Sequence, residues 1–216
     1  MGGKAPPAGP VGRWLEPGAG IPFPFFLLRL SVEGIAVEKN KKEEQCLRLY
    51  IPQPADGWFY GKMMSDPATM AYNAAWFPPD GCIPNAEAEW KDLCRDWIGQ
   101  EPERFYAYLQ RNSDGAFVGD VNFHYNPNKD WWDMGIVIYA PERGKGYGKQ
   151  GLGLLIDRAF RVAGVSRLRN EFETTREAAC HIHKAVGCRE VVTENGCVNL
   201  ELTREAYFCH DELIRI

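Results

Sequence analysis

The feature that most constrains the fold is a glycine-rich turn between an apolar strand and an amphipathic helix. Residues 131–139 alternate as a strand does, and residues 146–163 repeat their apolar positions with the period of a helix that ends at Gly164. Between them, glycine occupies positions 144, 146 and 148. Such a turn exposes peptide N–H groups at the positive end of a helix dipole, which favours an anion such as a pyrophosphate. Glycine costs about 0.5–1 kcal/mol relative to alanine inside an element, so a turn that only reversed the chain would not need all three.

Two other nucleotide-binding loops compete for this segment. The phosphate loop of nucleotide hydrolases needs a Ser or Thr after its lysine, and here Gln150 follows Lys149. A dinucleotide-binding fingerprint does match, because residues 146–151 read G-x-G-x-x-G and acidic residues 171 and 173 follow about twenty positions later. Only 65 residues follow Gly151, however, which is short for the rest of a dinucleotide-binding sheet. That alternative, a nicotinamide-binding protein, stays open as the weaker interpretation.

The remaining pattern predicts a mixed α/β sheet. Strands are expected at residues 47–51, 105–111, 116–125, 131–139, 167–173, 189–193 and 197–202. Helices are expected at residues 55–65, from Asp66-Pro67, from Asn85 to about residue 98, at 146–163, and from a capping box at Thr174–Glu177 to Gly187. Strands followed by a helix that crosses over to another strand are typical of such a sheet.

The segment Arg143–Gly148 resembles the R/Q-x-x-G-x-G/A signature of the GNAT acetyltransferase superfamily. The resemblance runs from about residue 46 to the C-terminus and includes Ala178-Ala179 and Gly187-Cys188 in the later helix; the whole chain is similar to bacterial members of unassigned substrate. It implies a GNAT domain over residues 46–216, with a mostly antiparallel central sheet that is splayed at the acetyl-CoA site and flanked by helices. Residues 1–45, where half of the first twenty are Gly or Pro, are expected to form a poorly ordered extension.

The resemblance also implies where acetyl-CoA would bind. The pyrophosphate would lie on Arg143, Gly144, Lys145, Gly146, Tyr147, Gly148 and Lys149. The pantetheine arm would enter the gap in the sheet and hydrogen-bond to backbone groups of Val137, Ile138 and Tyr139.

Two residues are candidates for the chemistry of acetyl transfer, which needs a neutral amine and a proton for the departing thiolate. Asp133 matches the position where many GNAT enzymes carry a Glu as general base, and its shorter side chain favours action through a water; a solvated carboxylate at a strand end is the equal alternative. His183 matches the position of a Tyr that protonates the CoA sulfur in relatives. The alternative for His183 is a buried histidine with its hydrogen bonds satisfied.

The acceptor would enter beside an aromatic loop after the first helices. The resemblance places the acceptor there, and the residues that we expect to contact it are Tyr72, Asn73, Trp76 and His124. Aromatic rings and nearby carboxylates favour a small cationic amine. The alternative, favoured for any single aromatic, is that it packs in the core, and only the cluster in a loop indicates a site. An acyl-CoA-binding sensor without turnover is the rival from another functional class.

Composition removes several other classes of protein. A net charge of −4 without a Lys/Arg stripe argues against a nucleic-acid partner, and no apolar run is long enough to span a membrane. Seven cysteines without a C-x-x-C pair predict free thiols in a reducing compartment, hence a cytoplasmic protein. The apolar residues 21–28 lack the cleavage site of a signal peptide. No metal-ligand spacing is present, and a homodimer is left open.

Overall fold

The computed structural model describes the backbone of residues 45–214 and the side chains of residues 45–209. The described residues belong to one compact unit, Glu43–Ile216. The predicted extension, residues 1–45, lies outside the described residues except for Gln45.

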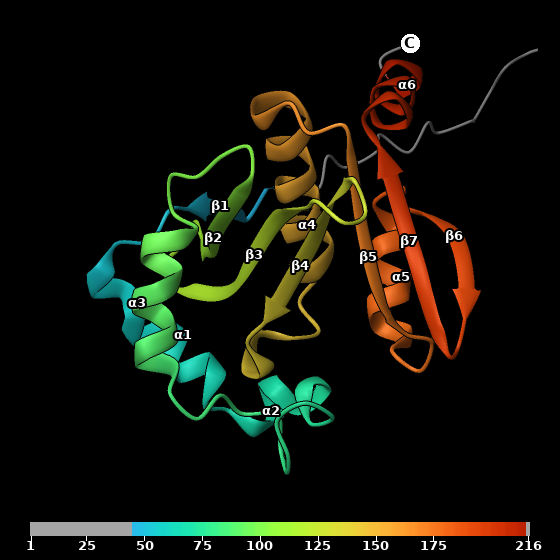
Figure 1. Ribbon diagram of the computed structural model, residues 1–216. Coiled ribbons are helices and arrows are strands. Elements are labelled where there is room, and N and C mark those ends of the chain that lie inside the picture. The colour runs from blue at the N-terminus through green and yellow to red at the C-terminus, as the bar shows by residue number, and fades with distance from the viewer. Residues whose placement is uncertain (1–44, 215–216) are drawn as a thin grey trace, which may run out of the picture. The chain divides into compact units, whose positions relative to one another are not determined.

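The described residues form a seven-stranded mixed sheet, which confirms the predicted fold class (Figure 1). The strands are β1 (Leu47–Tyr50), β2 (Arg104–Arg111), β3 (Phe117–Asn126), β4 (Trp131–Ile138), β5 (Arg167–Glu173), β6 (Arg189–Glu194) and β7 (Cys197–Thr203). Their order is β1-β2-β3-β4-β5-β7-β6. The pairing of β4 with β5 is parallel, and the other pairs are antiparallel.

The sheet opens between β4 and β5. On its other side, β4 pairs with β3 over its whole length, from Asn126↔Trp131 to Gly119↔Ile138. Toward β5 it pairs only at Trp132↔Leu168 and Asp133↔Arg169. Beyond residue 133 the two strands diverge, as Figure 1 shows, so the splayed sheet that the sequence predicted is confirmed.

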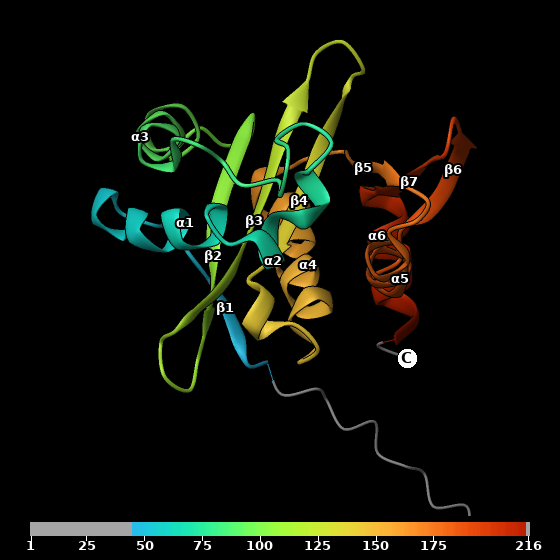
Figure 2. The ribbon, with the colours of Figure 1, turned by 90° about the horizontal axis from the view of Figure 1, so that it is seen from below.

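Helices cover both faces of the sheet (Figure 2). The helices are α1 (Gly57–Met64), α2 (Pro67–Met70), α3 (Ala86–Asp96), α4 (Tyr147–Asp157), α5 (Glu177–Ala185) and α6 (Arg204–Ile214). Short 3-10 turns lie at Pro54–Asp56, Ala71–Asn73 and Ala140–Glu142, and a π-helical turn, Arg158–Ala163, extends α4. The sequence pattern did not predict α6.

The strand period of two separates two cores. Alternate β2 residues such as Ala107 and Leu109 join Leu152, Leu155 and Phe160 in the core under α4. The residues between them belong to a second core, which we call the aromatic face; its members include Phe59, Tyr60, Trp90, Tyr106 and Tyr108. The two faces therefore differ in chemistry, with aliphatic packing under α4 and tyrosine hydroxyls on the opposite side.

One predicted local feature is wrong. Arg176 is the N-cap of α5, and no side chain caps the helix, so the capping box expected at Thr174–Glu177 does not form. The first residue of α5 is Glu177, the intended partner of that box. The start of α5 thus leaves the Arg176 side chain for other contacts.

Candidate active site

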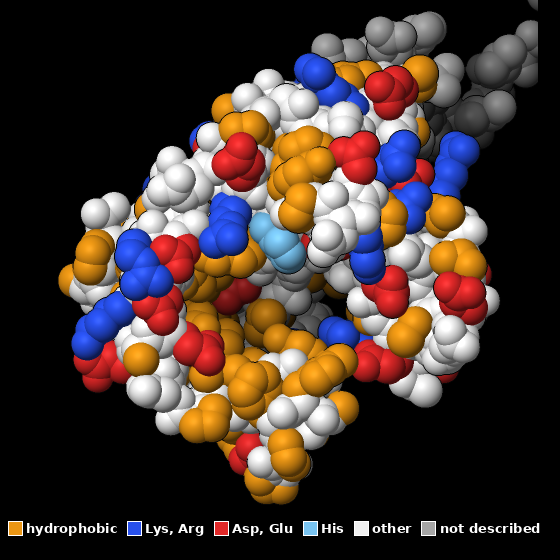
Figure 3. All heavy atoms as spheres, viewed as in Figure 1, with side chains coloured by type: hydrophobic (Ala, Val, Ile, Leu, Met, Phe, Trp, Pro, Cys, Tyr) orange, Lys and Arg blue, Asp and Glu red, His pale blue; other side chains and the backbone are white. Residues whose placement is uncertain are grey.

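A cavity of about 630 Å³ lies where β4 and β5 diverge. Its walls come from β4, the glycine-rich turn, the first turn of α4, β5 and α5, with Tyr72 of the 3-10 turn Ala71–Asn73 at one side. Figure 3 shows this face of the molecule hollowed between those segments. Of the residues predicted for acetyl-CoA, those that line the cavity are Val137, Ile138, Arg143, Gly144, Gly146, Tyr147, Gly148 and Lys149.

The backbone of β4 presents alternate peptide groups to this cavity. The N–H of Tyr139 donates to the carbonyl of Val118 over 3.0 Å. Because an antiparallel ladder alternates, the peptide groups of Val137 also face β3, and those of Ile136 and Ile138 face the gap. The backbone groups of Val137 and Tyr139, two of the three residues predicted to hold the pantetheine, therefore face β3, whereas Ile138, the third, has peptide groups that face the gap.

The glycine-rich turn has the backbone that its sequence requires. Gly144 and Gly146 both have φ of +79°, a conformation that favours glycine. Gly146 is the N-cap of α4 and has no side chain to satisfy the first peptide N–H groups of the helix. A Cβ at either glycine would meet nothing within 4 Å, so the turn is open toward the cavity. These N–H groups are free of intrahelical acceptors and suit an anionic ligand.

Arg143 and Lys145, two cations of the motif, both make hydrogen bonds to other groups of the protein. The guanidinium of Arg143 donates to the carbonyls of Ile138, Ala68 and Thr69, at 3.1, 2.9 and 2.9 Å. Arg143 thereby ties α2 to the end of β4. Arg143 also borders the cavity, so its predicted contact with the pyrophosphate stays a prediction.

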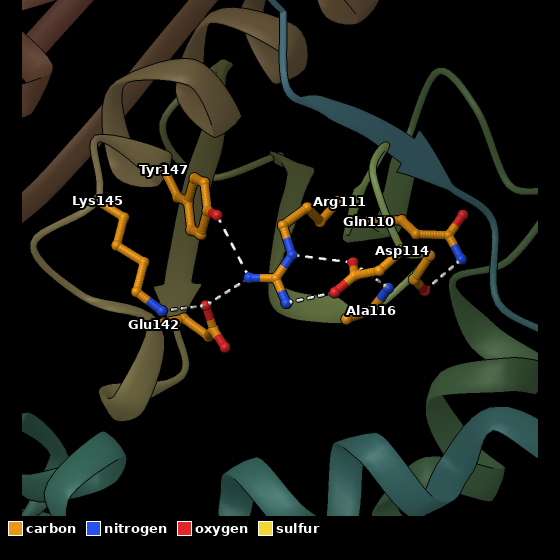
Figure 4. A network of polar contacts seen from close by, with 8 residues as sticks. Gln110, Arg111, Asp114, Ala116, Glu142, Lys145 and Tyr147 are labelled. Atoms are coloured by element: carbon orange, nitrogen blue, oxygen red, sulfur yellow. Dashed lines mark hydrogen bonds and ion pairs between the residues drawn. The ribbon is translucent and has the colours of Figure 1, made fainter.

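Lys145 belongs to a second network, which Figure 4 shows from close by. Its Nζ donates to Glu142 over 2.8 Å, and Glu142 also accepts from Arg111 over 3.0 Å. Arg111 donates further to the hydroxyl of Tyr147 and to Asp114. This network fixes the start of α4 to the end of β2, and Lys145 remains half-exposed within it.

Thr69 ties α2, which directly precedes the 3-10 turn that carries Tyr72, to the segment that follows β4. The Thr69 side chain is buried, donates to Asp66 and accepts the N–H of Ala140 over 2.9 Å. Arg176 stacks on Tyr72, with its guanidinium carbon 4.8 Å from the ring centre. Arg176 also lines the cavity, which the sequence analysis did not predict.

The predicted base, Asp133, lies on β4 on the aromatic face and outside the cavity lining. One of its oxygens accepts from the indole N–H of Trp131 over 2.7 Å, and the other accepts from the amide of Asn126 over 2.8 Å. The Nε2 of His124 is 3.8 Å away. Asp133 is thus a fixed, partly exposed carboxylate beside the predicted acceptor residue His124.

The predicted acid, His183, is buried in the wall of the cavity. Its Nδ1 lies 2.7 Å from the carbonyl oxygen of Ala179, and a carbonyl only accepts, so Nδ1 carries the proton. In the neutral ring, Nε2 accepts from the amide of Asn170 over 3.0 Å. Burial lowers the pKa of His183, against the opposing effect of its bond to Ala179. The ring therefore has no spare N–H for the CoA sulfur, and the alternative of a satisfied buried histidine is favoured.

Of the four predicted acceptor residues, three lie in or next to the 3-10 turn Ala71–Asn73, and His124 lies on β3. Tyr72 lines the cavity, whereas His124 lies beside Asp133 and against the edge of the Trp97 ring. Trp76 is 63% exposed and outside the cavity lining. The carbonyl of Asn73 accepts the N–H groups of Trp76 and Phe77, so the backbone of Asn73 closes a turn.

The sequence analysis missed a buried carboxylate on β3. Asp120 is 2% exposed, and its Oδ2 accepts from the hydroxyl of Tyr106 over 2.9 Å. Burial raises the pKa of Asp120 to about 7, although the bond from Tyr106 acts in the opposite direction. The available signal was an acidic residue between Val118 and Val121, in the first half of the strand, which is otherwise apolar.

Comparison with known proteins identifies the fold and the family. The profile of the acetyltransferase (GNAT) domain matches residues 46–189. The chain belongs to the GNAT acetyltransferase family. The predicted resemblance is confirmed, and the chain is an acetyl-CoA-dependent N-acetyltransferase. No curated protein matches its sequence.

Solved structures of this family share the fold at low identity. The Vibrio cholerae spermidine N-acetyltransferase, solved with CoA and spermine, superposes with a TM-score of 0.61 at 17% identity, over 75% of this chain and 98% of that one. A GNAT family acetyltransferase from Bacillus anthracis gives a TM-score of 0.59 at 14% identity, over 74% and 96%. A protein described as a nucleotide-linked sugar GNAT gives a TM-score of 0.58 at 14% identity, over 79% of this chain and 94% of that one.

Residues 45–214 contain no helix with the length and apolar character to cross a bilayer. Among the side chains of residues 45–209, no three His, Cys, Asp or Glu gather as metal ligands would.

Proposed function

We propose that the protein transfers the acetyl group of acetyl-CoA to a small cationic amine, by direct attack within a ternary complex. The observation that carries the proposal is the position of the cavity between β4 and β5. It borders the glycine-rich turn and the open start of α4 at one end and reaches Tyr72 beside the aromatic face. A CoA thioester in this cavity would meet an amine that approaches from the aromatic face.

The chemistry of the aromatic face supports a positively charged acceptor. Asp120 and Asp133 place carboxylates on adjacent strands of that face; Tyr72, at the cavity, is within reach of the charge of Asp120, and His124, beside Asp133, packs on Trp97. Aromatic faces and carboxylates both attract an ammonium group. The structural neighbour solved with CoA and spermine has a polyamine as its second ligand, which makes polyamines the first acceptors to try.

Each part of the site has a distinct role in this proposal. The peptide N–H groups at the start of α4 bind the pyrophosphate, aided by Lys145 once it leaves Glu142. Ile136 and Ile138 offer backbone groups to the pantetheine. Asp133 adds negative potential that draws in the amine. His183 with Asn170 forms the wall near the thioester.

The experiment that tests the proposal is thiol release from acetyl-CoA against a panel of amines. Spermidine, spermine, aminoglycosides, amino sugars, amino acids and peptides would each be offered to the full chain, and free CoA would be titrated. We expect CoA release with di- or polyamines and N-acetylated product in the mass spectrum. Binding of acetyl-CoA without release of thiol for any amine would favour the sensor alternative instead.

The cysteines bear on the cellular compartment in which the protein works. All seven cysteines are free thiols, from Cys46 to Cys209, which fits a reducing compartment. We therefore propose that the protein works in the cytoplasm.

A further inference from the structure

A polar side chain interrupts the apolar wall that the two diverging strands give to the cavity. Among the described residues that β4 and β5 contribute to this wall, Asn170 is the polar one; the others are Ile136, Val137, Ile138 and Phe172. Asn170 shares its face of β5 with Leu168 and Phe172, which are buried in the core under α4. In an apolar pocket, a few placed polar groups fix the orientation of the ligand. The amide of Asn170 is therefore a candidate for such a contact.

Asn170 lies where β4 and β5 part. The last pair between the strands joins Asp133 to Arg169, so Asn170 is the first residue of β5 beyond it. The glycine-rich turn and the start of α4 border the cavity from the other end of β4. From Asp133 to Ile138 the strand rises about 16 Å. An extended pantetheine arm that enters at the turn therefore brings its sulfur end toward Asn170.

The hydrogen bonds of His183 fix the orientation of the Asn170 amide. The carbonyl of Ala179, 2.7 Å from Nδ1, requires the ring proton on Nδ1 and leaves Nε2 as an acceptor. The atom of Asn170 that faces Nε2 over 3.0 Å is then the amino nitrogen Nδ2, because the amide oxygen could not donate. His183 is 1% exposed and burial lowers its pKa, so the ring stays neutral at neutral pH. The carboxamide of Asn170 is thus held in one orientation.

The Asn170 amide keeps one N–H and its carbonyl oxygen for a ligand. Within residues 45–209, the bond to His183 is the one hydrogen bond that the Asn170 side chain makes. Each amide of a pantetheine arm presents its N–H and its C=O on opposite edges. The edge toward β4 meets the peptide groups of Ile136 and Ile138 that face the gap. The other edge is left for Asn170, which can donate to a carbonyl or accept from an N–H.

We propose that Asn170 binds the pantetheine amide nearest to the thioester, and that His183 is the positioning residue that holds the Asn170 amide in place. The inference rests on the proposed function, since it takes acetyl-CoA to occupy this cavity. The contact fixes the inner end of the arm and with it the thioester carbonyl. His183 contributes here as the neutral, fully bonded ring that the structure shows, without giving a proton to the sulfur.

The test of Asn170 is calorimetric titration of three ligands into the full chain. The ligands are acetyl-CoA, CoA, and the phosphoadenosine diphosphate half of CoA, which lacks the pantetheine arm. We expect Asn170→Ala to weaken acetyl-CoA and CoA about tenfold alike, because the amide is common to both, and to keep the Kd of the nucleotide half within twofold. Asn199→Ala removes an amide from the opposite face of the adjacent strand β7, and this control should leave all three Kd values within twofold.

The test of His183 is a double-mutant cycle with Asn170. His183→Phe keeps a ring in the wall and removes the acceptor that orients the Asn170 amide. If His183 acts through Asn170, His183→Phe weakens CoA binding about threefold or more in the wild type and has no further effect in Asn170→Ala. Independent losses that multiply in the double variant would overturn the positioning role and leave His183 as wall packing.

The outcomes separate this inference from the proposed function. A wild type that binds CoA, with Asn170→Ala equally tight, would overturn the role of Asn170 alone. A loss for acetyl-CoA without a loss for CoA would place the contact on the acetyl group and overturn the assignment to the amide, and an equal loss for the nucleotide half would show a general distortion instead. A wild type that binds neither CoA nor acetyl-CoA would overturn the proposed function. If Asn170→Ala fails to fold, Asn170→Leu, which keeps the volume of the side chain, replaces it in the same titrations.

Discussion

Replacing Asp120 with Asn should remove a loss of stability that the wild type undergoes as the pH rises from 5 to 8. The pKa of Asp120 is about 7 in the folded protein, against an ordinary value of 3.8. The folded state therefore binds the proton more tightly than the unfolded state does. Stability contributed by this group is full below about pH 4 and is lost as the pH rises to about 7. Asn does not titrate, so Asp120→Asn escapes the loss.

The size of the effect follows from the two pKa values. Between pH 5 and pH 8, the wild type should lose about 2.6 kcal/mol of unfolding free energy through Asp120. The other carboxylates are shared by both proteins, so their contributions cancel in the difference. Relaxation and entry of water would make the value smaller, and we treat about 2.6 kcal/mol as an upper bound.

Urea unfolding at pH 5 and pH 8 measures this difference. The stability of Asp120→Asn minus that of wild type should rise between the two pH values by about 1–2.6 kcal/mol, with equal m-values. Asp133→Asn is the control on the neighbouring strand, because solvent already reaches the Asp133 side chain, which is 30% exposed. A difference for Asp120→Asn that stays constant from pH 5 to pH 8 would refute the reasoning, since it would mean that Asp120 is not a desolvated carboxyl.

Three further substitutions test the architecture around the cavity. Thr69→Val leaves the partly buried N–H of Ala140 without its acceptor and should cost about 1–3 kcal/mol of unfolding free energy, whereas Thr69→Ser should keep that bond; calorimetry measures both variants, and equal melting temperatures would contradict a stabilising role for the Thr69–Ala140 bond. Gly119→Ala places a Cβ against the Val137 carbonyl and should cost about 1–3 kcal/mol while weakening acetyl-CoA binding; an unchanged melting temperature would show that β3 and β4 can separate freely. His183→Ala should weaken acetyl-CoA binding and lower kcat together, because its ring is part of the wall; a fall in kcat alone would restore the acid role.

Much of the fold could be predicted because local patterns and tertiary packing agree in it. The alternation of residues 131–139 and the helical period after Gly146 gave the strand and the helix that the structure has at β4 and α4. The glycines at 144 and 146 have the positive φ that makes glycine necessary, so the motif was a reliable marker of the turn.

The candidate site was harder to predict because side-chain partners come from distant segments. Arg143 was expected to bind phosphate, and only the tertiary structure shows that it donates to Ala68 and Thr69, more than seventy positions away. The direction of the Tyr139 peptide group depends on the β3–β4 register, which periodicity does not give. Asp120 was missed because a strand pattern alone does not separate a solvated face from one covered by tyrosines.

The most direct test of the central claim, that the cavity between β4 and β5 binds acetyl-CoA, is calorimetric titration of acetyl-CoA into Gly146→Ala and Gly164→Ala. The two glycines have φ of +79° and +73°, and a Cβ at either meets nothing within 4 Å, so both variants carry the same backbone strain. Only Gly146 lines the cavity; Gly164 follows the π-helical turn after α4. We predict 1:1 binding to the wild type and to Gly164→Ala, and at least tenfold weaker binding to Gly146→Ala. Equal affinity in the two variants would contradict the account.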